Sequence, residues 1–224
     1  MSPIFSVFII NAASKKIEII HTIYRYSMNE VEMRYLIKTE SSFLAVIDHD
    51  FGDLLERCNE SIEGKLVQRP VITLFGKNVE QPRNIGFFSN ESIGYKYSHK
   101  VMLSQQLSEP LSELLNLINE MTDSNFNGIL VNEYPDGTHK IGAHSDDEGC
   151  LSRNGLVVCV SFGASRKLRF KDKATKETVM DVQTRNNEIL IMGGDFQKNY
   201  THEIPQEKKV KESRISYTFR THTK

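Results

Sequence analysis

The residues best suited to chemistry in this chain are two histidines and an aspartate in the second half of the sequence. His144 and Asp146 lie two residues apart in IGAHSDDEG (141–149), so on a β-strand they project from the same face. His202 in YTHEIP is a third candidate ligand. Two histidines and one carboxylate leave positions open on a bound metal. That is typical of non-haem Fe(II) oxygenases, although a hydrolytic zinc site has the same ligand count.

A second set of polar residues is suited to hold a small dicarboxylate beside such a metal. In RISYTFR (214–220) the alternation places Arg214 and Arg220 on one strand face, opposite an apolar face. Their Cα atoms are then about 20 Å apart at ~3.3 Å per residue, and arginine suits bidentate recognition of carboxylates. Asn132 and Tyr134 share a face in ILVNEYP and can bind the same ligand. The alternative for the arginines is an exposed edge strand with solubilising charges.

The overall composition is that of an ordinary globular protein. The chain has 224 residues, 25% of them charged, and a net charge of −1, so the whole molecule is not an electrostatic clamp for nucleic acid. Three cysteines without CxxC spacing predict a reducing, intracellular setting. No apolar run approaches the ~20 residues of a membrane span. The segment PIFSVFIINAA (3–13) is interpreted as a buried strand and not a signal peptide, because no positive residue precedes it.

The elements that must position these residues are mainly β-strands. Apolar periodicity predicts a helix within 48–65, stopped by Gly64, and a second helix over 108–121. After residue 125 at least six short strands follow with no helix between them, which favours a sandwich or jelly roll over a parallel α/β sheet. We divide the chain into a segment of unknown role, 1–38, with one or two strands, and one domain, 39–224.

These motifs together resemble the AlkB-type dioxygenases, which depend on Fe(II) and 2-oxoglutarate. The resemblance lies in five motifs that occur in the family's order: N-x-Y, H-x-D, S-x-G-x-x-R, a distal histidine and R-x5-R. In this chain they read NEYPDGTHKIGAHSDDE, VSFGASRKLRF, YTHEIP and RISYTFR. The sequence is most similar to members that repair alkylated nucleic acid. The match covers roughly 40–224 and is specific over 125–220.

The resemblance implies a fold, a cofactor set and a ligand set. The fold is mainly β with flanking helices (α+β), a double-stranded β-helix or jelly-roll core with an N-terminal nucleotide-recognition lid over 66–100. The cofactors are Fe(II), 2-oxoglutarate and O2. The implied iron ligands are His144, Asp146 and His202. The implied 2-oxoglutarate contacts are Asn132, Tyr134, Arg214 and Arg220, and which arginine holds which carboxylate stays open.

The resemblance also implies a site for a flipped base. Glu148 would help to select the base, whereas Asp147 is expected to face solvent or form a turn. Tyr95 and Tyr97 are expected to line the base pocket, because a base undergoing chemistry must leave the stack and lie between π faces. Phe75 matches an intercalating wedge, although it could equally be a core residue.

Basic segments are expected to contact the substrate backbone. Arg166 begins the basic run of SRKLRFKDKATK (165–176), which has six basic residues against one acid, and EKKVK (207–211) adds three more. Beside the pocket these loops would form a positive track for phosphates. The alternative is that they are simply solvated loops.

The implied activity is oxidative demethylation of 1-methyladenine and 3-methylcytosine in DNA or RNA, by a monomer. It is coupled to decarboxylation of 2-oxoglutarate to succinate and releases formaldehyde. The alternatives are a 2-oxoglutarate oxygenase acting on a protein or small molecule, a non-catalytic nucleic-acid-binding module, and a zinc hydrolase. The zinc hydrolase would have no use for the pair Arg214 and Arg220.

Overall fold

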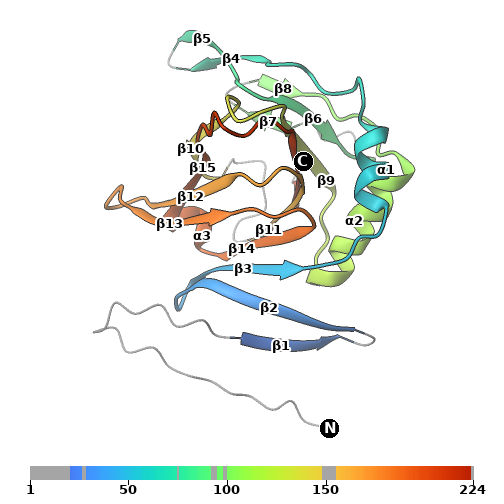
Figure 1. Cartoon of the computed structure of the whole chain (residues 1–224), viewed down its shortest axis with the longest axis vertical. Helices are drawn as coiled ribbons and strands as arrows, with labels where there is room; N and C mark the ends of the chain where they lie inside the picture. The colour runs from blue at the N-terminus through green and yellow to red at the C-terminus, as the bar shows by residue number, and fades with distance from the viewer. Residues whose placement is uncertain are drawn as a thin grey trace.

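Two β-sheets lie face to face and enclose a core between them, with two helices packed on the outer face of the larger sheet (Figure 1). The computed structural model describes residues 21–26, 29–74, 76–91, 95–97, 100–147 and 155–222. The larger sheet has eight strands in the order β1-β2-β3-β14-β11-β16-β9-β6. Its strands are β1 (His21–Tyr26), β2 (Asn29–Lys38), β3 (Ser42–Asp48), β6 (Asn84–Phe88), β9 (Gly128–Tyr134), β11 (Val157–Gly163), β14 (Glu188–Gly194) and β16 (Arg214–Arg220).

The smaller sheet has four strands in the order β10-β15-β12-β13. All three pairings within it are antiparallel. Its strands are β10 (Ile141–His144), β12 (Lys167–Asp172), β13 (Thr178–Gln183) and β15 (Tyr200–Ile204), and the short helix α3 (Phe196–Asn199) lies between β14 and β15. This pair of antiparallel sheets agrees with the predicted jelly roll.

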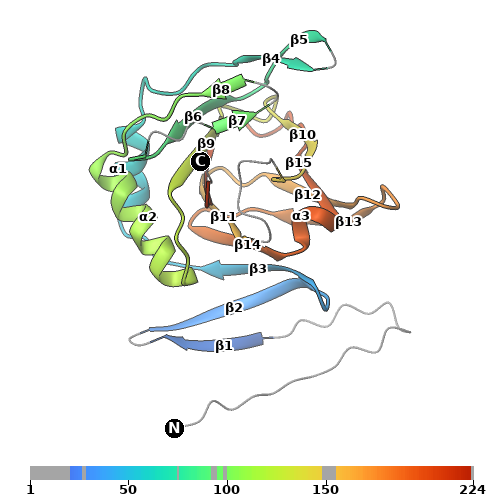
Figure 2. The ribbon, with the colours of Figure 1, turned by 180° about the vertical axis from the view of Figure 1, so that it is seen from behind.

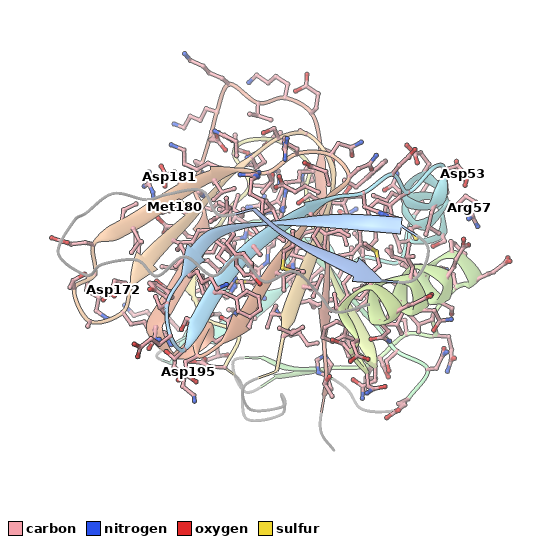
Figure 3. The ribbon with its side chains drawn as sticks, turned by 90° about the horizontal axis from the view of Figure 1, so that it is seen from below. Asp53, Arg57, Asp172, Met180, Asp181 and Asp195 are labelled. Carbon is pink, nitrogen blue, oxygen red and sulfur yellow. The ribbon has the colours of Figure 1, made fainter. Side chains whose placement is uncertain are left out.

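The core between the sheets comes from alternate residues of facing strands. Leu190 and Met192 of β14 meet Leu168 and Phe170 of β12, all of them buried. The opposite faces of β12 and β13 carry charged residues, as expected for a sheet with one solvated side. In Figure 3, Met180 and Asp181 of β13 lie on the far side of the molecule from the helices.

The helices α1 (Leu54–Ser61) and α2 (Glu109–Thr122) cover the other face of the large sheet, as Figure 2 shows. Asp53 and Arg57, at the start of α1, mark that side in Figure 3. The side chain of Ser108 accepts a hydrogen bond from the backbone N–H of Leu111, which caps α2, and Pro110 lies in its first turn. Apolar periodicity predicts a buried face of α2 made of Leu111, Leu114, Leu115, Ile118 and Met121; the first four are buried, and Met121 packs half-buried against the core.

The strand β16 has both of its faces buried, and the two faces differ in chemistry. Ile215, Tyr217 and Phe219 pack into the core under α1 and α2. Arg214, Ser216, Thr218 and Arg220 point the other way, into the space between the sheets. The alternation predicted from RISYTFR is therefore confirmed, and the exposed-edge alternative is wrong, because β16 lies between β9 and β11.

Two segment boundaries drawn from the sequence need correction. The boundary after residue 38 falls between β2 and β3, which pair antiparallel in the large sheet, so residues 29–38 continue the domain's own sheet. The segment 66–100 is not all lid, because β6 within it pairs with β9 and its Phe87 and Phe88 are fully buried. Two further antiparallel strand pairs begin in this region, β4 (Val71–Leu74) with β5 (Lys77–Glu80) and β7 (Tyr95–Tyr97) with β8 (Lys100–Met102).

No helix within the described part of the chain is long and apolar enough to cross a membrane.

Candidate active site

The two histidines of the motif are brought together by strand pairing in the smaller sheet. β10 runs antiparallel to β15, and His144 is the direct partner of His202 across this pair. Their ring centroids are 4.3 Å apart. Side chains directly opposite on antiparallel strands lie on the same face, so the pairing alone places both imidazoles in one spot.

Asp146 completes a three-residue cluster. One carboxylate oxygen, Oδ1, is 3.8 Å from Nε2 of His144, and the other, Oδ2, is 3.8 Å from Nε2 of His202. One potential ligand atom from each residue lies within 4.8 Å of the others. Oδ2 of Asp146 is buried and has no hydrogen-bond partner among the described residues. A buried carboxylate oxygen between two imidazoles fits a divalent cation, because such an oxygen otherwise remains unsatisfied.

The protonation states of the cluster also suit a metal. Burial lowers the pKa of His144, and burial together with the neighbouring His144 lowers the pKa of His202 to about 3. Burial opposes ionisation of Asp146, but the charge and hydrogen bond of Arg220 and the two neighbouring histidines together outweigh it and hold the pKa of the carboxyl below its usual value. At neutral pH the cluster therefore offers two neutral imidazoles and a carboxylate, the forms that bind metals.

A polar cradle lies beside the cluster, on the inner face of the large sheet. Arg214 pairs with Tyr134 across β16 and β9, and Ser216 pairs with Asn132. The guanidinium of Arg214 lies 5.6 Å from the Tyr134 ring centroid, its Nη2 donates to Oγ of Ser161 at 3.0 Å, and its buried Nε has no partner among the described residues. Arg220, at the other end of β16, has its Nη2 2.6 Å from Oδ1 of Asp146.

The cluster and the cradle line one cavity between the sheets. All four of the predicted dicarboxylate contacts and all three predicted metal ligands reach it. Its lining includes Asn132, Tyr134, His144, Asp146, His202, Arg214 and Arg220. A metal at the cluster and a dicarboxylate between the arginines would therefore be neighbours.

Among the cavity residues that sequence reasoning did not single out, Arg83 and Cys159 carry ionisable side chains. Arg83 is buried, and its Nε donates to Oδ1 of Asn132 at 2.8 Å. Cys159 lines the cavity from β11, and burial raises the pKa of its thiol. Arg83 comes just before β6, and only the pairing of β6 with β9 brings it beside Asn132. The QPR triplet was visible in the sequence, but nothing local indicated that pairing.

Arg166 was predicted to contact the substrate, and this prediction is wrong. Its side chain is fully buried. The guanidinium donates to the backbone oxygens of Asp136, His139 and Pro205 and forms an ion pair with Glu207. These partners lie just before β10 and just after β15, so Arg166 braces the two strands that carry the histidines.

The basic run of β12 is largely neutralised by its neighbours and is not an open positive track. Lys167 and Arg169 bind Asp181 of β13, and Lys171 binds Glu203 of β15. By contrast, the second basic segment is solvent-exposed at each of its lysines, Lys208, Lys209 and Lys211.

Several predicted substrate residues cannot be placed. Phe75 and Glu148 lie outside the described residues. Tyr95 and Tyr97 belong to β7, which pairs with β8, but only their backbone is described.

Comparison with known proteins agrees with this fold and site. The family model of the 2OG-Fe(II) oxygenase superfamily matches residues 52–220. Mouse DNA oxidative demethylase ALKBH2 is 29% identical over 173 residues, covering 74% of this chain and 71% of its own. Bovine alpha-ketoglutarate-dependent dioxygenase alkB homolog 3 is 32% identical over 151 residues, covering 63% of this chain and 52% of its own. The structure of OsALKBH1 covers 84% of this chain and all of its own, with a TM-score of 0.55 at 15% identity, which is a likeness of fold.

The chain belongs to the 2OG-Fe(II) oxygenase superfamily. Within that superfamily it is an AlkB-like member. It is therefore a dioxygenase whose cofactors are Fe(II), 2-oxoglutarate and O2. The zinc-hydrolase and non-catalytic alternatives are set aside by this assignment.

Proposed function

We propose that this dioxygenase demethylates N-alkylated bases in nucleic acid, with His144, Asp146 and His202 as the iron ligands. The observation that carries the proposal is the cluster of these three residues, in which Asp146 and His202 are buried and His144 half-buried, lining one cavity with the buried Arg214 and Arg220. The relatives support the choice of reaction, because mouse ALKBH2 is named a DNA oxidative demethylase. Bound at this cluster, Fe(II) supplies the redox chemistry that couples oxidative decarboxylation of 2-oxoglutarate to hydroxylation of a C–H bond.

The cradle residues would bind and orient 2-oxoglutarate. Arg220 contacts Asp146, so we assign it to the end of the ligand nearest the metal. Arg214 lies at the opposite end of β16 beside Tyr134, so we assign it to the distal carboxylate. A guanidinium buried beside an aromatic ring binds a carboxylate strongly, because little water competes for it. Asn132, held by Arg83, would complete the cradle.

The substrate would be 1-methyladenine or 3-methylcytosine in DNA or RNA. Both bases carry a positive charge, which a carboxylate such as that of Glu148 would favour. Tyr95 and Tyr97 would stack on the extruded base, and Phe75 would fill the gap that it leaves. Hydroxylation of the N-methyl group gives an unstable hemiaminal, which releases formaldehyde and the restored base.

The phosphate contacts are assigned to the exposed loop between β15 and β16. Its lysines at 208, 209 and 211 are all solvent-exposed, whereas the cations of β12 already have acidic partners. Each lysine that neutralises a phosphate releases counterions, so binding should weaken as salt rises.

The test is formaldehyde release from an oligonucleotide carrying 3-methylcytosine, with Fe(II), 2-oxoglutarate and ascorbate. The matched control is His144→Ala, which removes one proposed ligand. Release that requires 2-oxoglutarate and disappears in the control is the expected result. Succinate without formaldehyde would mean that the iron site works on another substrate, such as a protein or small molecule. Neither product, from folded and iron-loaded protein, would contradict the proposed reaction.

A further inference from the structure

The segment 145–147, which contains the ligand Asp146, is held from outside the cavity by three separate contacts. The Oγ of Ser145 donates to the backbone oxygen of Tyr200 at 2.9 Å. The backbone N–H of Asp146 donates to Oε1 of Gln197 at 3.0 Å. The carboxylate of Asp147 binds Nζ of Lys173 at 3.0 Å. Three consecutive residues are thus fixed to a region that is distant in sequence, at the end of β12 and around α3.

Gln197 is well placed to act as an anchor. It belongs to α3, whose Phe196 is fully buried and packs edge-on against Phe170, with ring centroids 5.6 Å apart. Its Nε2 donates to Sδ of Met192 at 3.4 Å, which turns its Oε1 toward the Asp146 N–H. The amide therefore presents an acceptor to a backbone group that can only donate.

Lys173 connects Gln197 to Asp147, the residue that follows the ligand Asp146. Its Nζ donates both to Asp147 and to the backbone oxygen of Gln197, at 3.0 and 2.7 Å. Its backbone N–H donates to the oxygen of Asn199 at 2.8 Å. Asp147 was expected to face solvent, and its side chain is 58% exposed, yet it has this partner. An exposed ion pair contributes little to stability by itself, but here the lysine also fixes α3.

We infer that Gln197 and Lys173 are positioning residues that hold the Asp146 peptide so that its carboxylate faces both histidines. The inference rests on the proposed function, in which Asp146 binds the metal. Asp146 lies two residues beyond the last residue of β10, so the strand pairing that fixes His144 and His202 does not extend to it. The Gln197 contact replaces that pairing at the backbone of the third ligand. Neither Gln197 nor Lys173 belongs to the lining of the cavity, so we assign both a role through Asp146 and not through direct contact with the metal.

The size of the effect follows from the behaviour of residues that orient metal ligands. Loss of such a partner typically lowers metal affinity by about 10- to 100-fold. Removing the Gln197 acceptor leaves the Asp146 N–H without its partner and loosens the backbone that carries the carboxylate, although Arg220 still binds Oδ1. Both histidines stay in place, so the metal should still bind, but more weakly.

The experiment measures the Kd of the full chain for Mn(II), a divalent probe that needs no turnover, by calorimetric titration. Gln197→Met keeps the length of the side chain and removes the acceptor, and we expect its Kd to rise about 10-fold or more. Gln197→Glu keeps an acceptor and should recover most of the affinity. Lys173→Gln should raise the Kd as well.

Lys198→Gln is the matched control for Lys173→Gln. Lys198 lies on α3 next to Gln197 and binds Asp195 at 2.7 Å, and among the described residues it has no hydrogen bond or ion pair with 144–147. Both substitutions remove one positive charge, which by itself should tighten binding of a cation or leave it unchanged. A rise in Kd for Lys173→Gln alone therefore reports positioning and not charge.

The outcomes separate this inference from the function on which it rests. If the unsubstituted chain does not bind Mn(II), the proposed ligand set fails. If it binds and Gln197→Met and Lys173→Gln bind equally well, the positioning role is overturned. A loss of affinity accompanied by an equal loss in Gln197→Glu, with a lowered Tm in both, would also overturn it, because that pattern indicates general structural damage.

Discussion

Arg220 binds Asp146 directly, with its Nη2 2.6 Å from Oδ1 of the carboxylate. Both side chains are buried, so the pair lies in an environment where charges interact strongly. The contact connects the third metal ligand to one end of the arginine-bearing strand β16. It means that the metal cluster and the dicarboxylate cradle share a residue and are not two independent sites.

The first prediction concerns this shared arginine. Arg220→Ala should raise the KM for 2-oxoglutarate at least about 30-fold, because truncating one partner of a buried charge pair costs about 2–5 kcal/mol. The KM of Arg220→Lys should lie between those of the unsubstituted chain and Arg220→Ala, since an ammonium keeps the charge but lacks the planar geometry of the guanidinium. Succinate formation at varied 2-oxoglutarate gives the KM. Arg69→Ala, which removes an exposed arginine paired with Glu80, is the control and should leave the KM unchanged.

The second prediction compares two arginines on neighbouring parts of the chain. Arg166→Met should lower the free energy of unfolding by about 3–5 kcal/mol, because it leaves Glu207 and three backbone oxygens without their buried donor. Arg169→Met removes a partly exposed pair with Asp181 and should cost less than about 1 kcal/mol. Urea denaturation gives both values. Equal losses in the two variants would mean that Arg166 is not the brace that its contacts indicate.

Local sequence pattern predicted those parts of the fold that depend on neighbours in sequence. The alternation in 214–220 correctly separated the core face from the cavity face. The spacing of apolar residues in α2 identified its buried side, and the succession of short strand-like segments after residue 125 indicated a jelly roll. These properties follow from the 2.0 and 3.6 residue periods of strands and helices, which a sequence displays directly.

Cross-strand partners could not be predicted in the same way. Nothing near His144 indicates that β10 pairs with β15, and the three ligands were grouped only through ligand chemistry and family resemblance. Arg83 enters the cavity through the pairing of β6 with β9, and Arg166 is buried because two loops close over it. The acidic partners of β12 likewise lie on adjacent strands. In each case the missing information was register between segments distant in sequence.

The third prediction concerns the loop contact that supports Arg166. Gly137 exchanges backbone hydrogen bonds with Val210 and Glu207, at 2.9 and 2.8 Å. A Cβ at this position would overlap the backbone oxygen of Glu207, so Gly137→Ala must push the two loops apart. We expect a loss of about 1–3 kcal/mol, as for other overpacked sites. Gly142→Ala is the control for stability, because its added Cβ would have nothing within 4 Å. Thermal or urea unfolding of the two variants checks the difference.

The last prediction is a fall in stability at mildly acidic pH, caused by a buried histidine outside the proposed metal cluster. Burial lowers the pKa of His222 to about 4, against a value of about 6.5 in an unfolded chain. Between these values the unfolded chain binds a proton that the folded protein does not.

The free energy of unfolding therefore rises with pH across this window. The contribution of His222 to it is lost as the pH falls from about 6.5 toward 4. The expected contribution of one such group is a slope of up to about 1.4 kcal/mol per pH unit. His202, with a pKa of about 3 in the metal-free protein, contributes in the same direction.

His222→Asn isolates the contribution of His222, because asparagine does not titrate in this range. Urea unfolding at pH 7, 6 and 5 should show a shallower pH dependence in the variant than in the unsubstituted chain, whatever the variant costs at pH 7. The backbone N–H of residue 222 can still donate to Oδ1 of Asn127, so this contact with the C-terminal segment does not depend on the imidazole. Parallel pH profiles would mean that the pKa of His222 is the same in the folded and unfolded chain. Its burial against Phe87 would then not oppose protonation.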